Sequence, residues 1–183
     1  MTTLAKDSPR TYELGDIQEY GVIASDIIYE GAMVGLNGSG HARPLVADDP
    51  FAGFAIAKAD NSTGAAAAIN VRVQKRGAVK FSISGLAITD VGKDVFASDD
   101  DVMTLTQGTN TRIGYVERFI STGVGVVAFQ AVNGVLTELT DSSGGTASDT
   151  LAAISGTYVQ SEVRNSIASL AAKITALTRR LGN

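Results

Sequence analysis

Side chains that could carry out catalysis are few in this chain, which has one histidine, no cysteine and no tryptophan. His41 lies in a predicted loop from Gly38 to Pro44, and no Ser or carboxylate pattern accompanies it. A Ser-His-Asp triad or a histidine acid–base site would have to use this residue. Without cysteine there is no thiolate nucleophile, no disulfide and no cysteine-ligated metal. We therefore expect His41 to be a surface residue and the protein to be no enzyme.

One acidic cluster, Asp99-Asp100-Asp101, could offer several oxygens to a hard cation such as Ca²⁺. It lacks the glycine and the distal glutamate of an EF-hand loop, so we expect a solvated β-turn. The glycine-rich stretch from Gly35 to Gly40 lacks the GKS/T ending of a phosphate-binding loop. Composition leaves a paired-carboxylate glycosidase site open, although only 6% aromatic residues offer little for sugar stacking. No catalytic residue, metal or cofactor is predicted.

One basic cluster is formed by Lys75, Arg76 and Lys80, with Arg72 nearby. These side chains could form a patch for an acidic protein surface, or simply the solvated face of a strand. A net charge of −4 and a pI near 4.9 argue against general binding to nucleic acid or to anionic membranes. No apolar run approaches the ~18 residues of a membrane span. The amino-terminal residues show no signal-peptide pattern, so we expect synthesis in a cytoplasm.

The elements that must position these side chains are predicted to be strands over residues 17–135. Short apolar runs alternate with turn signals at intervals of about ten residues. Val71 and Val73 alternate with Arg72 and Gln74, which is the period of a strand with one buried face. No segment has a 3.6-residue period long enough for a core helix. We predict a mainly β fold, a small β-barrel or sandwich-like module.

Two stretches of this region resemble each other at an offset of 61 residues. Gly31 matches Gly92, Val34 matches Val95, and the pair at 53–54 (Gly-Phe) matches the pair at 114–115 (Gly-Tyr). The pattern suggests a duplicated β unit, or chance matches in a chain with 20 glycines.

The rest of the chain divides by composition. We assign residues 1–16 to an amino-terminal arm, 17–135 to the β-rich module, 136–156 to a Gly/Ser-rich linker, and 157–183 to a helix. A short helical turn is expected at 149–154 within the linker. A capping-box pattern over residues 157–160 (Thr-Tyr-Val-Gln) marks the start of the helix.

The predicted helix carries apolar residues with heptad spacing. Its a and d positions are occupied by Val163, Ile167, Leu170, Ile174, Leu177 and Leu181. Such a narrow stripe is typical of an oligomeric coiled coil rather than of a helix that lies on its own domain. The second arrangement is the alternative, but the linker and the narrow stripe favour self-association. Ile at a with Leu at d favours two strands, yet three heptads are too short to set the order alone.

A family resemblance adds to these patterns. The stretch from Gly92 to Thr106, followed by Ile-Gly-Tyr-Val at 113–116 and a Val-rich strand, resembles the head-decoration (capsid cement) proteins of tailed double-stranded-DNA phages. Gly31 to Leu36 and the Gly-Phe-Ala strand at 53–55 also fit the layout of that family. The resemblance implies a β-rich trimer, without enzyme activity, that binds the outer capsid where major capsid subunits meet. The trimer it implies takes precedence over the two-strand preference of the short coil.

The expected function is therefore that of a structural virion protein, which binds the capsid surface as a homotrimer and stabilises the head shell. Its expected partners are itself and the major capsid protein, without direct contact to nucleic acid or membrane. The expected capsid contacts are the arm residues Leu4 and Tyr12 and the basic residues Arg72, Lys75, Arg76 and Lys80. The alternatives are a trimeric head-fibre, tail-fibre or spike module that recognises a receptor or glycan, and a hydrolase of the envelope or of a polysaccharide.

Overall fold

The structure, a computed structural model, describes residues 15–131, residue 146 and residues 160–181, with backbone only for 178–181. Most of the predicted arm, including Leu4 and Tyr12, lies outside the described residues. So do nearly all of the predicted linker with its helical turn, the capping-box residues before Gln160, and the side chain of Leu181.

The first half of the β region forms a five-stranded antiparallel sheet and a small two-stranded one. The strand order of the larger sheet is β1-β7-β5-β3-β4, and β2 pairs with β6. These strands are β1 (Ile17–Gly21), β2 (Ile27–Ile28), β3 (Met33–Leu36), β4 (Ala42–Pro44), β5 (Phe51–Ala55), β6 (Ala59–Asp60) and β7 (Asn70–Gln74). As the sequence predicts, Val71 and Val73 are buried. We call residues 15–74 the first module.

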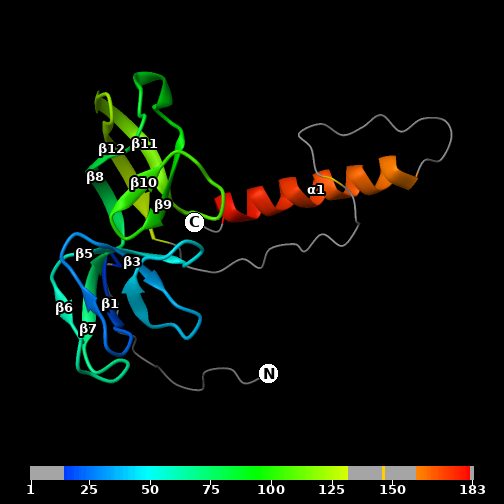
Figure 1. The fold of residues 1–183 in the computed structure, drawn as a ribbon. Helices are drawn as coiled ribbons and strands as arrows, with labels where there is room; N and C mark the ends of the chain where they lie inside the picture. The colour runs from blue at the N-terminus through cyan, green and yellow to red at the C-terminus, as the bar shows by residue number, and fades with distance from the viewer. Residues whose placement is uncertain (1–14, 132–145, 147–159, 182–183) are drawn as a thin grey trace, which may run out of the picture.

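The second half forms another five-stranded antiparallel sheet, in the order β10-β9-β11-β12-β8. Its elements are β8 (Arg76–Ser82), the 3-10 helix η1 (Ile88–Asp90), β9 (Asp94–Asp99), β10 (Val102–Thr104), β11 (Thr111–Ser121) and β12 (Val124–Gln130). Residues 76–131 are the second module. The two modules lie one above the other (Figure 1).

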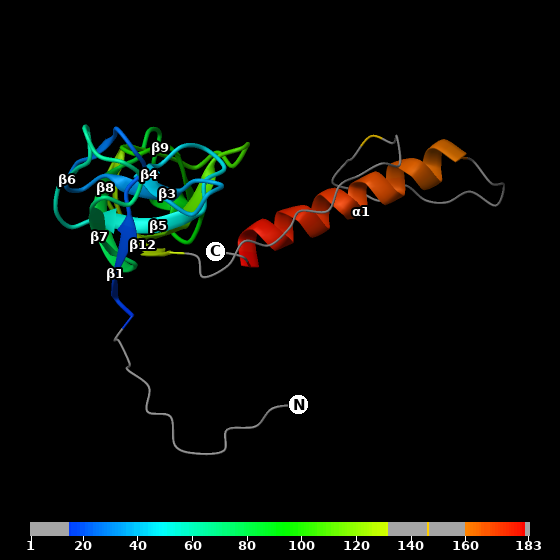
Figure 2. The ribbon, with the colours of Figure 1, turned by 90° about the horizontal axis from the view of Figure 1, so that it is seen from below.

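The predicted mainly β fold is confirmed, and the described part of the chain is sandwich-like, without a closed barrel. The one described helix, α1 (Gln160–Leu181), stands apart from both sheets (Figure 2).

The two modules are structural duplicates. Reversed, the strand order of the second sheet is β8-β12-β11-β9-β10, which matches β1-β7-β5-β3-β4 element by element. Both sheets shift register at the same place: Val34 faces Gly53 before the shift, and Val95 faces Gly114 in the other copy. Short parallel bridges, Val22 with Ala42 and Ile83 with Met103, also repeat at the 61-residue offset.

Backbone hydrogen bonds repeat as well. The Gly31 N–H donates to the carbonyl of Ala55, and the Gly92 N–H donates to that of Val116, both at 2.8 Å. Gly31 and Gly92 share the same left-handed φ of +86°, which favours glycine at each strand entry. The duplication that a few sequence matches suggested is therefore confirmed by topology, register and hydrogen bonding.

Each module buries apolar side chains on the inner face of its sheet, but the sizes differ. The first uses small residues such as Ala42 and Ala52, where the second has Met103 and Ile113. The second core also takes in four residues of the first module, namely Met33, Leu45, Phe51 and Phe54. One continuous apolar cluster thus joins the modules, and its burial stabilises their arrangement.

Aromatic and polar contacts fix this junction. The ring of Phe54 meets that of Phe129 edge-on, with centroids 4.7 Å apart, a geometry that the ring quadrupoles favour. The buried hydroxyl of Thr111 donates to the carbonyl of Asp49 at 2.8 Å. The Met33 N–H donates to the carbonyl of Asp100, also at 2.8 Å. The two modules are therefore held in one relative position by directional contacts as well as by apolar burial.

Candidate assembly surface

The heptad residues of α1 form an exposed apolar seam. Relative exposures are 51% for Ile167, 55% for Leu170, 41% for Ile174 and 55% for Leu177. Val163, one turn before them, is partly buried. Large apolar side chains in this condition are costly to leave in water. Covering the seam with another apolar surface would therefore lower the free energy of the protein.

Another face of the same helix is buried. Ala168, Ser169 and Ala171 have little exposed surface, and the Ser169 hydroxyl donates to the carbonyl of Asn165 at 2.8 Å. The small residues and the large ones therefore lie on different sides of α1. The side with the large residues is open to solvent, as are polar positions such as Arg164 and Lys173.

The basic residues expected to contact a capsid do not form one uncompensated patch. Arg72 lies on β7, while Arg76 and Lys80 lie on β8 of the other sheet, and Lys75 lies between the two strands. Sequence reasoning missed their partners, which lie on the distant strand β1 or just before it. Arg72 pairs with Glu19 at 3.4 Å and Arg76 pairs with Asp16 at 2.5 Å. These exposed pairs add little stability, but they offset two of the four positive charges.

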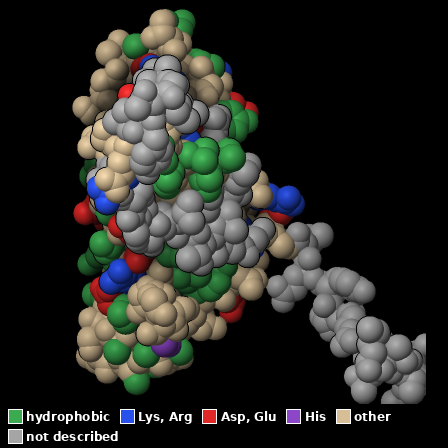
Figure 3. All heavy atoms as spheres, turned by 90° about the vertical axis from the view of Figure 1, so that its right-hand side faces the viewer, with side chains coloured by type: hydrophobic (Ala, Val, Ile, Leu, Met, Phe, Trp, Pro, Cys, Tyr) green, Lys and Arg blue, Asp and Glu red, His purple; other side chains and the backbone are tan. Residues whose placement is uncertain are grey.

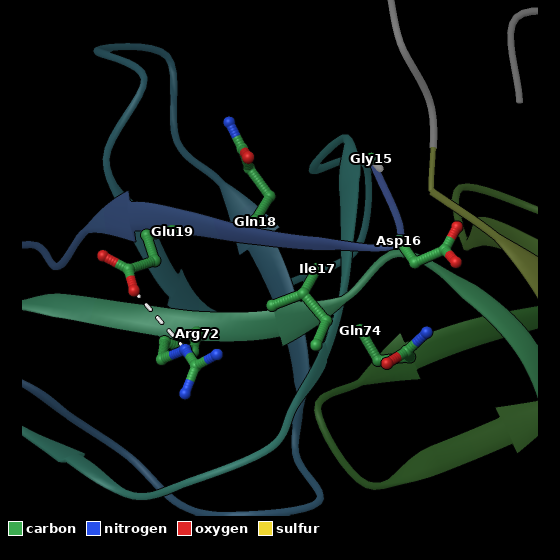
Figure 4. Close-up of a pocket in the computed structure, with 7 residues that line it drawn as sticks. All are labelled: Gly15, Asp16, Ile17, Gln18, Glu19, Arg72 and Gln74. Atoms are coloured by element: carbon green, nitrogen blue, oxygen red, sulfur yellow. Dashed lines mark ion pairs between the residues drawn. The ribbon is translucent and has the colours of Figure 1, made fainter. Parts of the chain in front are cut away.

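The residues around β1 border an open depression on the surface (Figure 4). It is lined by Gly15, Asp16, Ile17, Gln18, Glu19, Arg72 and Gln74. Ile17 and Gln18 point to opposite sides of the strand, and the Glu19–Arg72 pair borders the depression. β1 is also an end strand of its sheet. A sheet edge beside a depression is a place where another polypeptide can dock.

The acidic cluster is the turn between β9 and β10, as the sequence predicts. Burial raises the pKa of the Asp100 carboxyl to about 6, and its hydrogen bond with Asp99 acts in the same direction. The same side-chain hydrogen bond lowers the pKa of Asp99. Near pH 5 the pair therefore shares one proton, with Asp100 as the donor. This turn touches the first module through the backbone of Met33, so the proton sits at the junction between the modules.

The raised pKa of Asp100 predicts a pH-dependent stability. Between about pH 4 and pH 6 the folded chain binds more protons at this site than the unfolded chain, so this contribution is present below about pH 4 and is lost as the pH rises through 6. We expect Asp100→Asn to be more stable than the wild type at about pH 7.5, by on the order of 1 kcal/mol after discounting for solvent screening. At about pH 3.5, where this carboxyl is largely protonated in the folded and the unfolded chain alike, the difference should nearly vanish.

Urea denaturation at the two pH values measures this effect. The matched control is Asp101→Asn, which removes a carboxylate from the exposed neighbouring position of the same turn. Equal gains for both variants at the higher pH would contradict a special role for Asp100.

His41 is half-buried, and its carbonyl accepts the N–H of Asn37 within the β3–β4 turn. Among the residues that the structure describes, no three His, Cys, Asp or Glu side chains are grouped so that they could hold a metal ion. Within the same residues, no helix is long and apolar enough to cross a membrane.

Apolar side chains also reach the surface of the β region, scattered among polar ones (Figure 3). Those with the largest exposures include Tyr29, Ile88 and Val102, and Tyr115 is 45% exposed on β11. Sequence patterns did not single these out as functional residues. The one available signal was the match of Gly53-Phe54 with Gly114-Tyr115, because it places an exposed tyrosine where the duplicate has a buried phenylalanine.

Comparisons with known proteins add little to this description. No protein-family model matches the sequence, and no curated protein matches it. Among solved structures, the chain is similar to the N base of head fiber gp8.5 of bacteriophage phi29, with 14% sequence identity and a TM-score of 0.40. That similarity covers 64% of this chain and 99% of the other. At this TM-score it does not establish a shared fold.

Proposed function

We propose that this chain is a non-enzymatic structural protein of a phage virion, which binds the outer capsid surface as a homotrimer and stabilises the shell. The observation that carries the self-association is the exposed heptad seam of α1, with four large side chains more than two-fifths exposed. The capsid as destination is supported by the turn-and-strand patterns of the β region, which resemble those of capsid decoration proteins.

The energetics of the seam limit what it can do alone. Covering a half-exposed Ile or Leu gains about 1 kcal/mol, so four of them on each of three chains gain on the order of 10 kcal/mol. Association costs roughly 4–15 kcal/mol in lost translation and rotation, and ordering side chains costs more. The coil is therefore marginal by itself, and the β modules must contribute contacts between copies.

The capsid contact is assigned to the β region. Arg72, Lys75, Arg76 and Lys80 remain candidates, although Asp16 and Glu19 neutralise two of them in the isolated chain. An acidic capsid surface would have to compete with these pairs. Binding through this surface should therefore weaken as salt increases, but without the steep dependence of an uncompensated basic patch.

Light scattering on the purified chain tests the association, and cosedimentation with capsid shells that lack the protein tests the destination. We expect a mass of three chains and saturable binding to the shells. A monomer at micromolar concentration would overturn the homotrimer. An oligomer that ignores the shells and is found at the tail of the source particle would point instead to a fibre or spike module.

A further inference from the structure

The duplicated modules differ in one respect that concerns assembly. Within the chain, the first module uses the outer face of its sheet to contact the second. Met33 pairs opposite Phe54, and Phe54 opposite Gln74, so their side chains share that face. Phe54 then meets Phe129 and Phe81 of the second module, with ring centroids 4.7 Å and 6.5 Å away.

Phe129 and Phe81, which Phe54 contacts, lie on the inner face of the second sheet. Phe129 pairs opposite Gly114, which is itself opposite Val95, a residue of the inner core. The contact therefore joins two different surfaces. One is the outer face of the first sheet, and the other is the inner face of the second sheet, where Phe129 and Phe81 lie. Contacts of this head-to-tail kind leave one copy of each surface unused, and they can continue from one molecule to the next.

Both unused surfaces can be identified from the duplication. The outer face of the second module carries the row Asp94, Tyr115 and Ala128, which occupies the positions of Met33, Phe54 and Gln74. Tyr115 is 45% exposed where Phe54 is only 7% exposed. The position of Phe81 corresponds to Tyr20 on β1, a half-buried residue at the end of the first sheet.

The chemistry of the unused outer face suits an interface that forms after folding. Where the internal junction has Phe51, this face has Arg112, which pairs with Asp94 at 3.0 Å and so presents no net charge. Tyrosine and arginine tolerate water before assembly and are enriched in protein interfaces. The internal junction is buried in the folded chain and has Met33, Phe51 and Phe54 at these places.

The loops also show one contact used within the chain and a duplicate left unused. The turn in which the Asp49 N–H donates to the Val46 carbonyl recurs in the second module, where the Asn110 N–H donates to the Gln107 carbonyl. The first turn bridges to Asp99 of the second module through Val46. The counterpart of Asp99 is Gly38, in an exposed turn of the first module.

From these relations we propose that copies of this chain join head to tail, with Tyr115 of one copy against Tyr20 of the next. The contact repeats the internal one in which Phe54 meets Phe129 and Phe81, with Lys75 in the place of Phe129 and Tyr20 in that of Phe81. Three copies would present six modules in succession. This inference rests on the proposed self-association and supplies the contacts between β modules that the short coil requires.

Site-directed cross-linking tests it, because the chain has no cysteine of its own. The double variant Tyr20→Cys/Tyr115→Cys is treated with a short bismaleimide and analysed on a denaturing gel. We expect covalent products of two and three chains. Each single variant alone should give none, and a mixture of the two refolded together should give a two-chain product.

Two further variants complete the design. Gln18→Cys/Tyr115→Cys replaces the first pair if Tyr20→Cys fails to fold, since Gln18 corresponds to Val79, which lies against the same cluster as Phe54. Tyr29→Cys/Tyr115→Cys is the control with an exposed tyrosine elsewhere. No product above that control, with the oligomer still present by light scattering, overturns the head-to-tail contact and leaves the coil-driven trimer standing. A monomeric protein overturns both.

Discussion

Replacing Ile174 with aspartate is expected to dissociate the proposed homotrimer. Ile174 lies at a central a position of the heptads and is 41% exposed in the single chain, so the described residues of that chain do not cover it. In the proposed coil an aspartate at this position would place one unpaired carboxylate per chain against apolar side chains. The cost is on the order of several kcal/mol per bundle, enough to cancel the gain from a short seam.

Sedimentation equilibrium over a range of concentrations measures the loss. The matched control is Ala172→Asp, which adds the same charge to an exposed position of the same helix, away from the seam. We expect the control to keep the mass of the wild type. If Ile174→Asp kept it as well, the seam would not be the surface that joins the copies, whatever the β modules do.

The exposed apolar seam could be predicted because its spacing is a local pattern. The apolar residues recur every three or four positions along one continuous helix, and α1 spans the predicted positions from Val163 to Leu181. The ion pairs of Arg72 and Arg76 could not be predicted in this way. They depend on strand β1 lying beside β7, a pairing between segments about fifty residues apart that no local pattern specifies.

The duplication could be predicted only in part from the sequence. Glycines at strand entries and at the register shift persist in both modules because the backbone demands them, and these were the matches visible in the sequence. Most side chains have diverged because the modules have different neighbours. Phe54 is covered within the chain, whereas Tyr115 meets solvent, so burial favours a purely apolar ring at only the first of the two positions.

Replacing Gly114, the glycine at the register shift of the second sheet, with alanine is expected to destabilise the fold strongly. A Cβ at residue 114 would overlap the carbonyl oxygen of Ala128 on strand β12, and a Cβ at Gly53 would overlap the corresponding carbonyl of Gln74 on β7. These neighbours are backbone atoms of a paired strand, so they can move only by breaking ladder hydrogen bonds. We expect Gly114→Ala to lower the free energy of unfolding by at least about 3 kcal/mol, and Gly53→Ala to do the same.

Urea denaturation followed by circular dichroism measures both losses, with Gly38→Ala as the control. Gly38 lies in the β3–β4 turn, where a methyl group would meet no other atom within 4 Å and the φ is not left-handed. Its substitution should therefore change stability by no more than about 0.5 kcal/mol. Because Gly53 and Gly114 occupy equivalent places, their losses should be similar in kind even though their sheets have different cores. A full loss at one position and none at the other would mean that the two sheets do not share the register shift, and the surfaces assigned to Tyr115 and Tyr20 by that equivalence would no longer correspond.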